Sequence, residues 1–196
     1  MKRRFCVIVP LLVMGVTGAC RDGSADQAAI RAASDRARGA IAAFQGALKA
    51  RLLDAIATGG AISAIGVCKE AAPAIAARSG DDAGVEIGRT ALKIRNAANA
   101  PDAWERGVLE RFEDALAKGR PAGDLFETRV TGDGDRRVLR TMAPIMTGGL
   151  CLTCHGAQID PDLAAEIDRL YPNDRARGFA LDSLRGAFTV TVPLAE

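Results

Sequence analysis

The stretch FETRVTGDGDRRVLRTMAPI, residues 126–145, decides the fold class, because the hydrophobic period changes here from that of helices to that of strands. Charged Glu127 and Arg129 alternate with a second set of side chains, Phe126, Thr128 and Val130. This alternation predicts a strand with one apolar face. Asp133 and Gly134 predict a turn, after which 136–145 returns as the second strand of a β-hairpin.

Helices fill the chain before this hairpin. Between Asp26 and Ala57, apolar residues recur every three or four positions, which is typical of a long amphipathic helix. TGGA, residues 58–61, predicts a break, and the second helix that follows carries one apolar stripe: Ile62, Ile65, Cys68, Ala72 and Ile75. We expect the two helices to form an antiparallel pair. RSGDDAG, residues 78–84, predicts a loop, and 99–119 predicts a third helix that Gly119 ends.

A short helix, a loop and one more strand follow the hairpin. Residues 161–171 predict the helix, YPNDRARGF (171–179) the loop, and GAFTVTVPL (186–194) the strand. In that strand Phe188, Val190 and Val192 are expected to face one way. Helices followed by antiparallel strands predict an α+β fold, with long N-terminal helices packed on a small antiparallel sheet. We expect one domain, residues 20–196.

Residues 1–19 are typical of a secretory signal peptide, with a basic start and an apolar stretch too short for the ~20 residues of a membrane helix. The junction TGAC, residues 17–20, resembles the lipobox of bacterial lipoproteins, in which Cys20 becomes the lipidated N-terminus. Thr17 departs from that pattern, so ordinary cleavage near Ala19 remains an alternative. We predict a periplasmic protein that meets the membrane only through a lipid on Cys20.

Composition argues against two function classes. The chain has 26 Lys and Arg against 24 Asp and Glu, and only 4% aromatic residues, which disfavours nucleic-acid binding. No cluster of acids, bases and nucleophiles suggests a catalytic site, so we predict that the protein is not an enzyme.

The segment GGLCLTCHGAQ, residues 148–158, combines Cys151 and Cys154 with His155, the sole histidine of the chain. C-x-x-C-H is the attachment signature of c-type haem. Each thiol adds across one vinyl group of the porphyrin, and the imidazole binds the iron. The sequence therefore predicts one covalent haem c, with His155 as a ligand through Nε2.

A C-x-x-C pair also has uses other than haem attachment. A thioredoxin-like dithiol needs a βαβ context and no following histidine. A Cys₃His zinc site from Cys68, Cys151, Cys154 and His155 would have to turn two adjacent side chains onto one small ion. A structural Cys151–Cys154 disulfide in a lipoprotein binding module would leave the protein colourless. The last two remain the alternative interpretation.

The sequence does not determine the second axial ligand of the iron. With one histidine in the chain, the candidates are Met142, Met146, a lysine, Cys68 or an open site. The methionines stand so close before Cys151 that they would struggle to reach the far face of a porphyrin. Cys68 is the cysteine left without a partner, but spacing alone favours a small core residue there.

Five blocks in order carry a family resemblance: AIGVCKEAAPAIA (64–76), ALKIRNAANAPDAWE (91–105), MAPIMTGGLCLTCHG (142–156), YPNDRARGF and LRGAFTVTVPL (184–194). From about Ala61 to its end the chain resembles the bacterial and cyanobacterial family of monohaem c-type proteins with a PAS-like fold, a domain of unknown function. The resemblance implies a PAS-like fold, and it implies that Cys68 is the second axial ligand, opposite His155. RNAAN, residues 95–99, departs from it, since the family more often has proline after the first asparagine.

A thiolate ligand stabilises ferric iron and predicts a low reduction potential. We therefore expect either one-electron transfer with unidentified redox partner proteins or the sensing of redox state or a small gas. Arg89, Arg95 and Arg177 are candidates to hold haem propionates, because the planar guanidinium suits carboxylates, and Tyr171 is a further candidate. Trp104 either belongs to the core or packs on the macrocycle.

Overall fold

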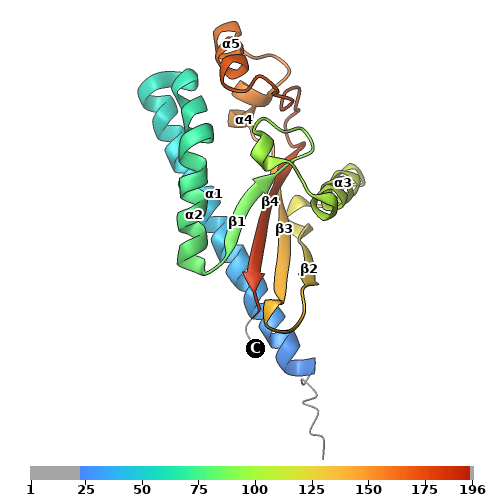
Figure 1. Ribbon diagram of the computed structural model, residues 1–196. Helices are drawn as coiled ribbons and strands as arrows, with labels where there is room; N and C mark the ends of the chain where they lie inside the picture. The colour runs from blue at the N-terminus through green and yellow to red at the C-terminus, as the bar shows by residue number, and fades with distance from the viewer. Residues whose placement is uncertain (1–22, 195–196) are drawn as a thin grey trace, which may run out of the picture.

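The computed structural model describes residues 23–194, so the predicted signal peptide and the lipidation site at Cys20 lie outside the described residues. Helices surround a four-stranded antiparallel sheet with the strand order β1-β4-β3-β2 (Figure 1). The elements are α1 (Gly23–Gly66), the π-helical turn η1 (Val67–Ala71), α2 (Ala72–Ala83), β1 (Glu86–Thr90), α3 (Ala103–Ala117), β2 (Glu127–Thr131), β3 (Val138–Met146), α4 (Gly149–His155), α5 (Pro161–Leu170) and β4 (Leu184–Pro193). The predicted α+β fold, with long N-terminal helices on a small antiparallel sheet, is confirmed.

The N-terminal helices form a hairpin that turns at Gly60. This residue has φ 72° and ψ −174°, a non-helical conformation inside α1. Beyond it the chain runs back beside the first arm as the end of α1, η1 and α2 (Figure 1). The predicted break at 58–61 and the antiparallel pair are therefore confirmed.

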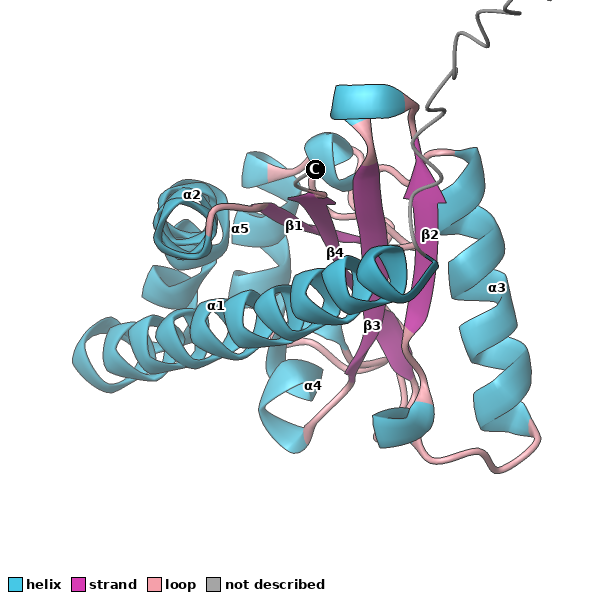
Figure 2. Cartoon of the chain, turned by 90° about the horizontal axis from the view of Figure 1, so that it is seen from below, coloured by secondary structure: helices cyan, strands magenta, loops and turns pink. Residues whose placement is uncertain are grey.

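The first arm of α1 lies across one face of the sheet (Figure 2). Ala33, Ala37 and Ala40 are buried there, and their small side chains let the helix approach β3 and β4 closely. Phe188, Val190 and Val192 of β4 face this arm, as the alternation in the sequence predicted. They form the larger hydrophobic core.

Helix α3 covers the opposite face of the sheet. Its Val108, Leu109 and Phe112 are buried against Met142 and Ala187 in a second core. A capping box starts the helix: the Glu105 N–H donates to the Asp102 carboxylate, and the Asp102 N–H donates to the Glu105 carboxylate. The sheet is thus buried on both sides.

The fold differs from the sequence-based expectation in several places, of which three follow. Residues 78–83 belong to α2 rather than to a loop, and Gly84, with φ 62°, ends that helix. Strand β1 was not predicted, because it is short and contains Gly88. The hairpin turn spans residues 132–137 and contains a 3₁₀ turn, so it is longer than an Asp-Gly turn.

By length and composition alone, the helical segment Gly23–Ala83 is apolar enough to cross a membrane, with a window of mean hydropathy 1.4. The backbone of this segment reverses direction at Gly60. The predicted absence of a membrane span stays a prediction.

Candidate functional site

A pocket opens between the α1–α2 hairpin, one end of β1 and helix α4. It has an empty volume of about 1220 Å³, which includes the space at its mouth. All four residues predicted to bind a cofactor line it: Cys68, Cys151, Cys154 and His155. We call this cavity the main pocket.

The walls of the main pocket differ in polarity. The α1–α2 hairpin supplies an apolar wall made of Leu48, Leu52, Ile56, Ala61, Ala64 and Ile65. Strand β1, the segment after it and β4 supply the positively charged residues Arg89, Arg95 and Arg185. The pocket therefore suits a ligand with a large apolar body and negatively charged groups.

Helix α4 brings three of the four predicted residues together. Cys154 and His155 follow Cys151 by three and four positions, so all three share one helical face. Gly156 ends the helix in extended backbone, and a Cβ there would lie 2.6 Å from the carbonyl oxygen of Leu152. Glycine is therefore needed for the chain to leave α4 at this point.

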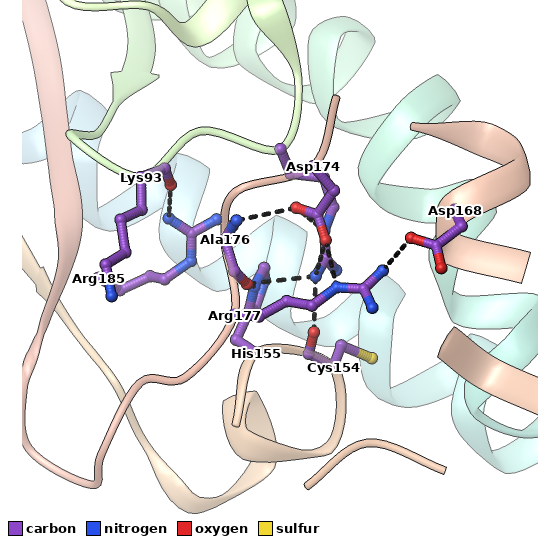
Figure 3. Close-up of polar contacts among 9 residues, drawn as sticks. Lys93, Cys154, His155, Asp168, Asp174, Ala176, Arg177 and Arg185 are labelled. Carbon is purple, nitrogen blue, oxygen red and sulfur yellow. Dashed lines mark hydrogen bonds and ion pairs between the residues drawn. The ribbon is translucent and has the colours of Figure 1, made fainter. Parts of the chain in front are cut away.

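His155 is held in a defined tautomer. Its Nδ1 lies 2.7 Å from the carbonyl oxygen of Ala176, which only accepts hydrogen bonds, so Nδ1 carries the proton and Nε2 is left free (Figure 3). Burial, together with the positive charges of Arg185 and Arg95, lowers the pKa of His155 to about 3. A neutral imidazole oriented by a hydrogen bond from its other nitrogen is the form that binds metals.

The loop that carries Ala176 is fixed by a buried ion-pair network. The Asp174 side chain is 1% exposed, and its carboxylate accepts hydrogen bonds from Arg95 at 3.1 Å and Arg177 at 2.8 Å. Arg95 also donates to the carbonyl oxygen of Cys154 at 2.6 Å. Figure 3 shows how this network joins the loop to α4 beside His155.

Electrostatics agree with this arrangement. Burial by itself would raise the pKa of Asp174, but the hydrogen bonds from Arg95, Arg177 and the Ala176 N–H outweigh it and lower the pKa. Burial raises the pKa of Cys154, and the positive charge of Arg95 opposes that effect.

Cys68 reaches the main pocket from the helical hairpin. It lies in η1, a single π-helical turn between α1 and α2, and such turns are frequent at functional sites. A second cavity, between α2 and β1, is also lined by Cys68. Cys68 therefore stands between two cavities instead of being a fully enclosed core residue.

The other candidate axial ligands lie elsewhere. Met142 is fully buried in the core under α3, and Met146 packs against the same core. Neither methionine and none of the lysines is among the described residues that line the main pocket. Cys68 is the candidate that shares the cavity with His155.

The described residues give no support to the alternative uses of the cysteines. Cys68, Cys151 and Cys154 are free thiols. Across residues 23–194, no three His, Cys, Asp or Glu side chains are grouped so that they could hold a metal ion by themselves. Residues 23–194 thus contain neither alternative as a formed site, and both alternatives stay predictions.

The other singled-out residues separate into two groups. Arg89 and Tyr171 line the main pocket, whereas Arg177 pairs with Asp174 and Asp168 outside it. Trp104 packs into the core under α3, with the Arg140 guanidinium 4.5 Å from its ring centroid. It is a core residue that does not line the main pocket.

Sequence reasoning missed Arg185. This residue lies where the pairing of β3 with β4 shifts register, because Ile145 pairs with Gly186 and Met146 with Leu184. The bulge turns Arg185 toward the main pocket, an effect that a regular alternation does not predict. The one signal in the sequence that could have found Arg185 is its place in the block LRGAFTVTVPL (184–194), which carries the family resemblance.

The comparisons with known proteins agree with the fold. Residues 23–193 match the family described as Tll0287-like. The structure is similar to the crystal structure of the cyanobacterial heme-protein Tll0287, with a TM-score of 0.53 and 22% sequence identity over 89% of this chain and 98% of that chain. Comparison with curated proteins finds no significant match. Since the family match spans nearly the whole described chain, the protein belongs to the Tll0287-like family.

Proposed function

We propose that the protein is an exported haem protein that holds one covalently attached haem c in the main pocket. The Cys151 and Cys154 thiols form the two thioethers, each adding its S–H across one vinyl double bond, so no oxidant is needed. His155 binds the iron through Nε2, and the Cys68 thiolate is the second axial ligand. The similarity to a heme-protein of the same family supports this assignment.

The observation that carries the proposal is the convergence of Cys68, Cys151, Cys154 and His155 on one cavity. Residue 68 is more than 80 positions from the C-x-x-C-H motif, so only the fold brings these side chains together. The residues also fit a porphyrin in their polarity, because an apolar wall faces a group of arginines.

Bound haem would supply a one-electron iron couple, and the residues of this chain would set its properties. A thiolate from Cys68 stabilises the ferric state and predicts a low reduction potential. Both axial positions are then filled by the protein, so we propose electron transfer or sensing rather than catalysis. Periplasmic localisation and the lipid on Cys20 belong to the same proposal.

Mass spectrometry tests the attachment. We expect the polypeptide, exported from a host that matures c-type cytochromes, to carry the added mass of one haem. The Cys151→Ala/Cys154→Ala variant should lose that mass. A colourless wild-type protein without added mass, from a host whose own cytochromes are mature, would refute the proposed function.

The Cys68→Ala variant tests the second ligand. Optical and electron-spin spectra of the ferric wild-type protein should be those of a low-spin thiolate complex. The variant should lose this signature while it keeps the covalent haem, because its thioethers are intact. An unchanged ferric spectrum would assign Cys68 a packing role only.

A second candidate function, gas sensing, is favoured by the position of Cys68 between two cavities. A small molecule entering between α2 and β1 would meet the Cys68 side of the site. We expect that reduction weakens the Cys68 bond, so CO added to the reduced protein should shift the Soret band. No shift would leave electron transfer as the function.

A further inference from the structure

Two arginines of the main pocket have no carboxylate partner. Arg89, the last residue but one of β1, forms no ion pair with any residue from 23 to 194, and its guanidinium lies 5.7 Å from the ring centroid of Phe44. Arg185 is likewise unpaired in this part of the chain. It donates one hydrogen bond, to the carbonyl oxygen of Lys93 at 3.3 Å (Figure 3). Its guanidinium lies 5.0 Å from the Phe179 ring centroid.

Most hydrogen-bond donors of these two side chains are therefore unused. A guanidinium has five N–H donors, and the described residues occupy one of those on Arg185 and none on Arg89. The aromatic rings of Phe44 and Phe179 hold the planar groups without satisfying their donors. Both residues line the main pocket, so a ligand there can reach the remaining donors.

The two arginines are also electrostatically unfavourable as they stand. Burial lowers the pKa of Arg89. Burial, together with repulsion from Arg95 and Arg89, lowers the pKa of Arg185 to about 10. Both side chains are half-buried, and charges withdrawn from water are normally paired, so this local excess of positive charge calls for a negatively charged ligand.

Arg95, the other arginine of the pocket, already has a carboxylate partner. It donates to the Asp174 carboxylate and to the carbonyl oxygens of Cys154 and Ala176. The sequence named Arg89 and Arg95 among four separate candidates to hold a propionate. In the structure Arg95 holds the Asp174 loop against α4. Arg185 takes its place beside Arg89 as a candidate carboxylate binder.

We propose that Arg89 and Arg185 form a carboxylate-binding pair that holds the two propionates of the haem in the main pocket. This inference rests on the proposed function, because the haem supplies the two carboxylates. Arginine suits the role, since its planar fork binds a carboxylate through two parallel hydrogen bonds. The pair also favours the ferrous state by neutralising negative charge close to the iron.

Redox titration of the haem-loaded protein tests the pair. The variants are Arg89→Gln, Arg185→Gln and their combination, with Arg129→Gln, an exposed arginine on β2, as the charge-matched control. We expect the double variant to shift the ferric-to-ferrous ratio at least tenfold toward ferric, which is a fall of 59 mV for one electron. Arg185→Lys and Arg89→Lys, which keep the charge, should retain most of the wild-type potential.

Resonance Raman spectra provide the second readout. The propionate bending bands respond to hydrogen bonds on the propionates, so they would not change if Arg89 and Arg185 only stabilised the fold. These bands should shift in both Gln variants and stay in place in Arg129→Gln. If the haem is present but neither the potential nor the bands differ from the control, the pair is refuted while the proposed function stands. Colourless protein would instead refute the proposed function itself.

Discussion

Thr141, in the middle of β3, has a hydroxyl that lacks a hydrogen-bond partner within the part of the chain that the structure describes. The residue is 0% exposed and faces the core beneath α1. A buried donor without an acceptor destabilises the folded state, whereas an apolar group of the same shape does not.

We therefore expect Thr141→Val to stabilise the protein by about 1 kcal/mol. The valine keeps the β-branched shape that suits a strand and removes the unpaired hydroxyl. Chemical denaturation measures the change in the free energy of unfolding. Thr128→Val is the matched control, because Thr128 pairs with Thr141 across β2 and β3 but is exposed. A Thr141→Val variant less stable than the wild type would contradict this account of the hydroxyl.

The α1–α2 hairpin depends on the conformation of Gly60. At φ 72° and ψ −174° this residue occupies a region that is open essentially to glycine alone. The turn brings the second arm, and with it Cys68, back over the main pocket. A local backbone requirement thus determines where a predicted ligand lies.

Gly60→Ala should destabilise the protein by about 1–3 kcal/mol, the cost of a strained backbone. Gly46→Ala provides the control, since Gly46 is an exposed position in the first arm of α1 with open space around it. There alanine should raise stability by about 0.5–1 kcal/mol through its higher helix propensity. Equal thermal stability of the two variants would argue against a strained turn.

At the scale of the whole molecule, Asp174 connects segments that are far apart in sequence. Its carboxylate joins Arg95, before α3, to the loop after α5, and Arg95 in turn holds the backbone of Cys154. This network orients the His155 imidazole through Ala176.

Asp174→Asn should cost about 3 kcal/mol at neutral pH, because it leaves the nearly buried Arg95 without a carboxylate and Arg177 with Asp168 alone. The folded-state pKa of Asp174 lies below its unfolded value of about 4. Its contribution is therefore complete above pH 4 and is lost as the pH falls through the folded-state pKa. Thermal unfolding between pH 7 and pH 3 should show the variant and the wild type converging in acid. The control is Asp133→Asn, which removes an exposed ion pair with Arg136 and should change the stability little. A loss of stability in Asp174→Asn that stays constant from pH 7 down to pH 3 would count against the network.

Much of the fold was predictable because its signals are local. The change of hydrophobic period before residue 126, the glycines at 58–61 and the alternation in 186–194 each depend on neighbouring residues. Strand β1 escaped prediction because it is short and contains a glycine. Its place at the edge of the sheet comes from pairing with β4, about 100 residues away.

The sequence by itself determined that Cys151, Cys154 and His155 lie close together, because no more than four positions separate them along the chain. Only the tertiary structure decided that Cys68 shares their cavity while Met142 and Met146 do not. The same holds for Arg185, which a bulge turns inward. The physical reason is that the reversal at Gly60 and the register of β4 fix long-range distances, and no local pattern specifies these.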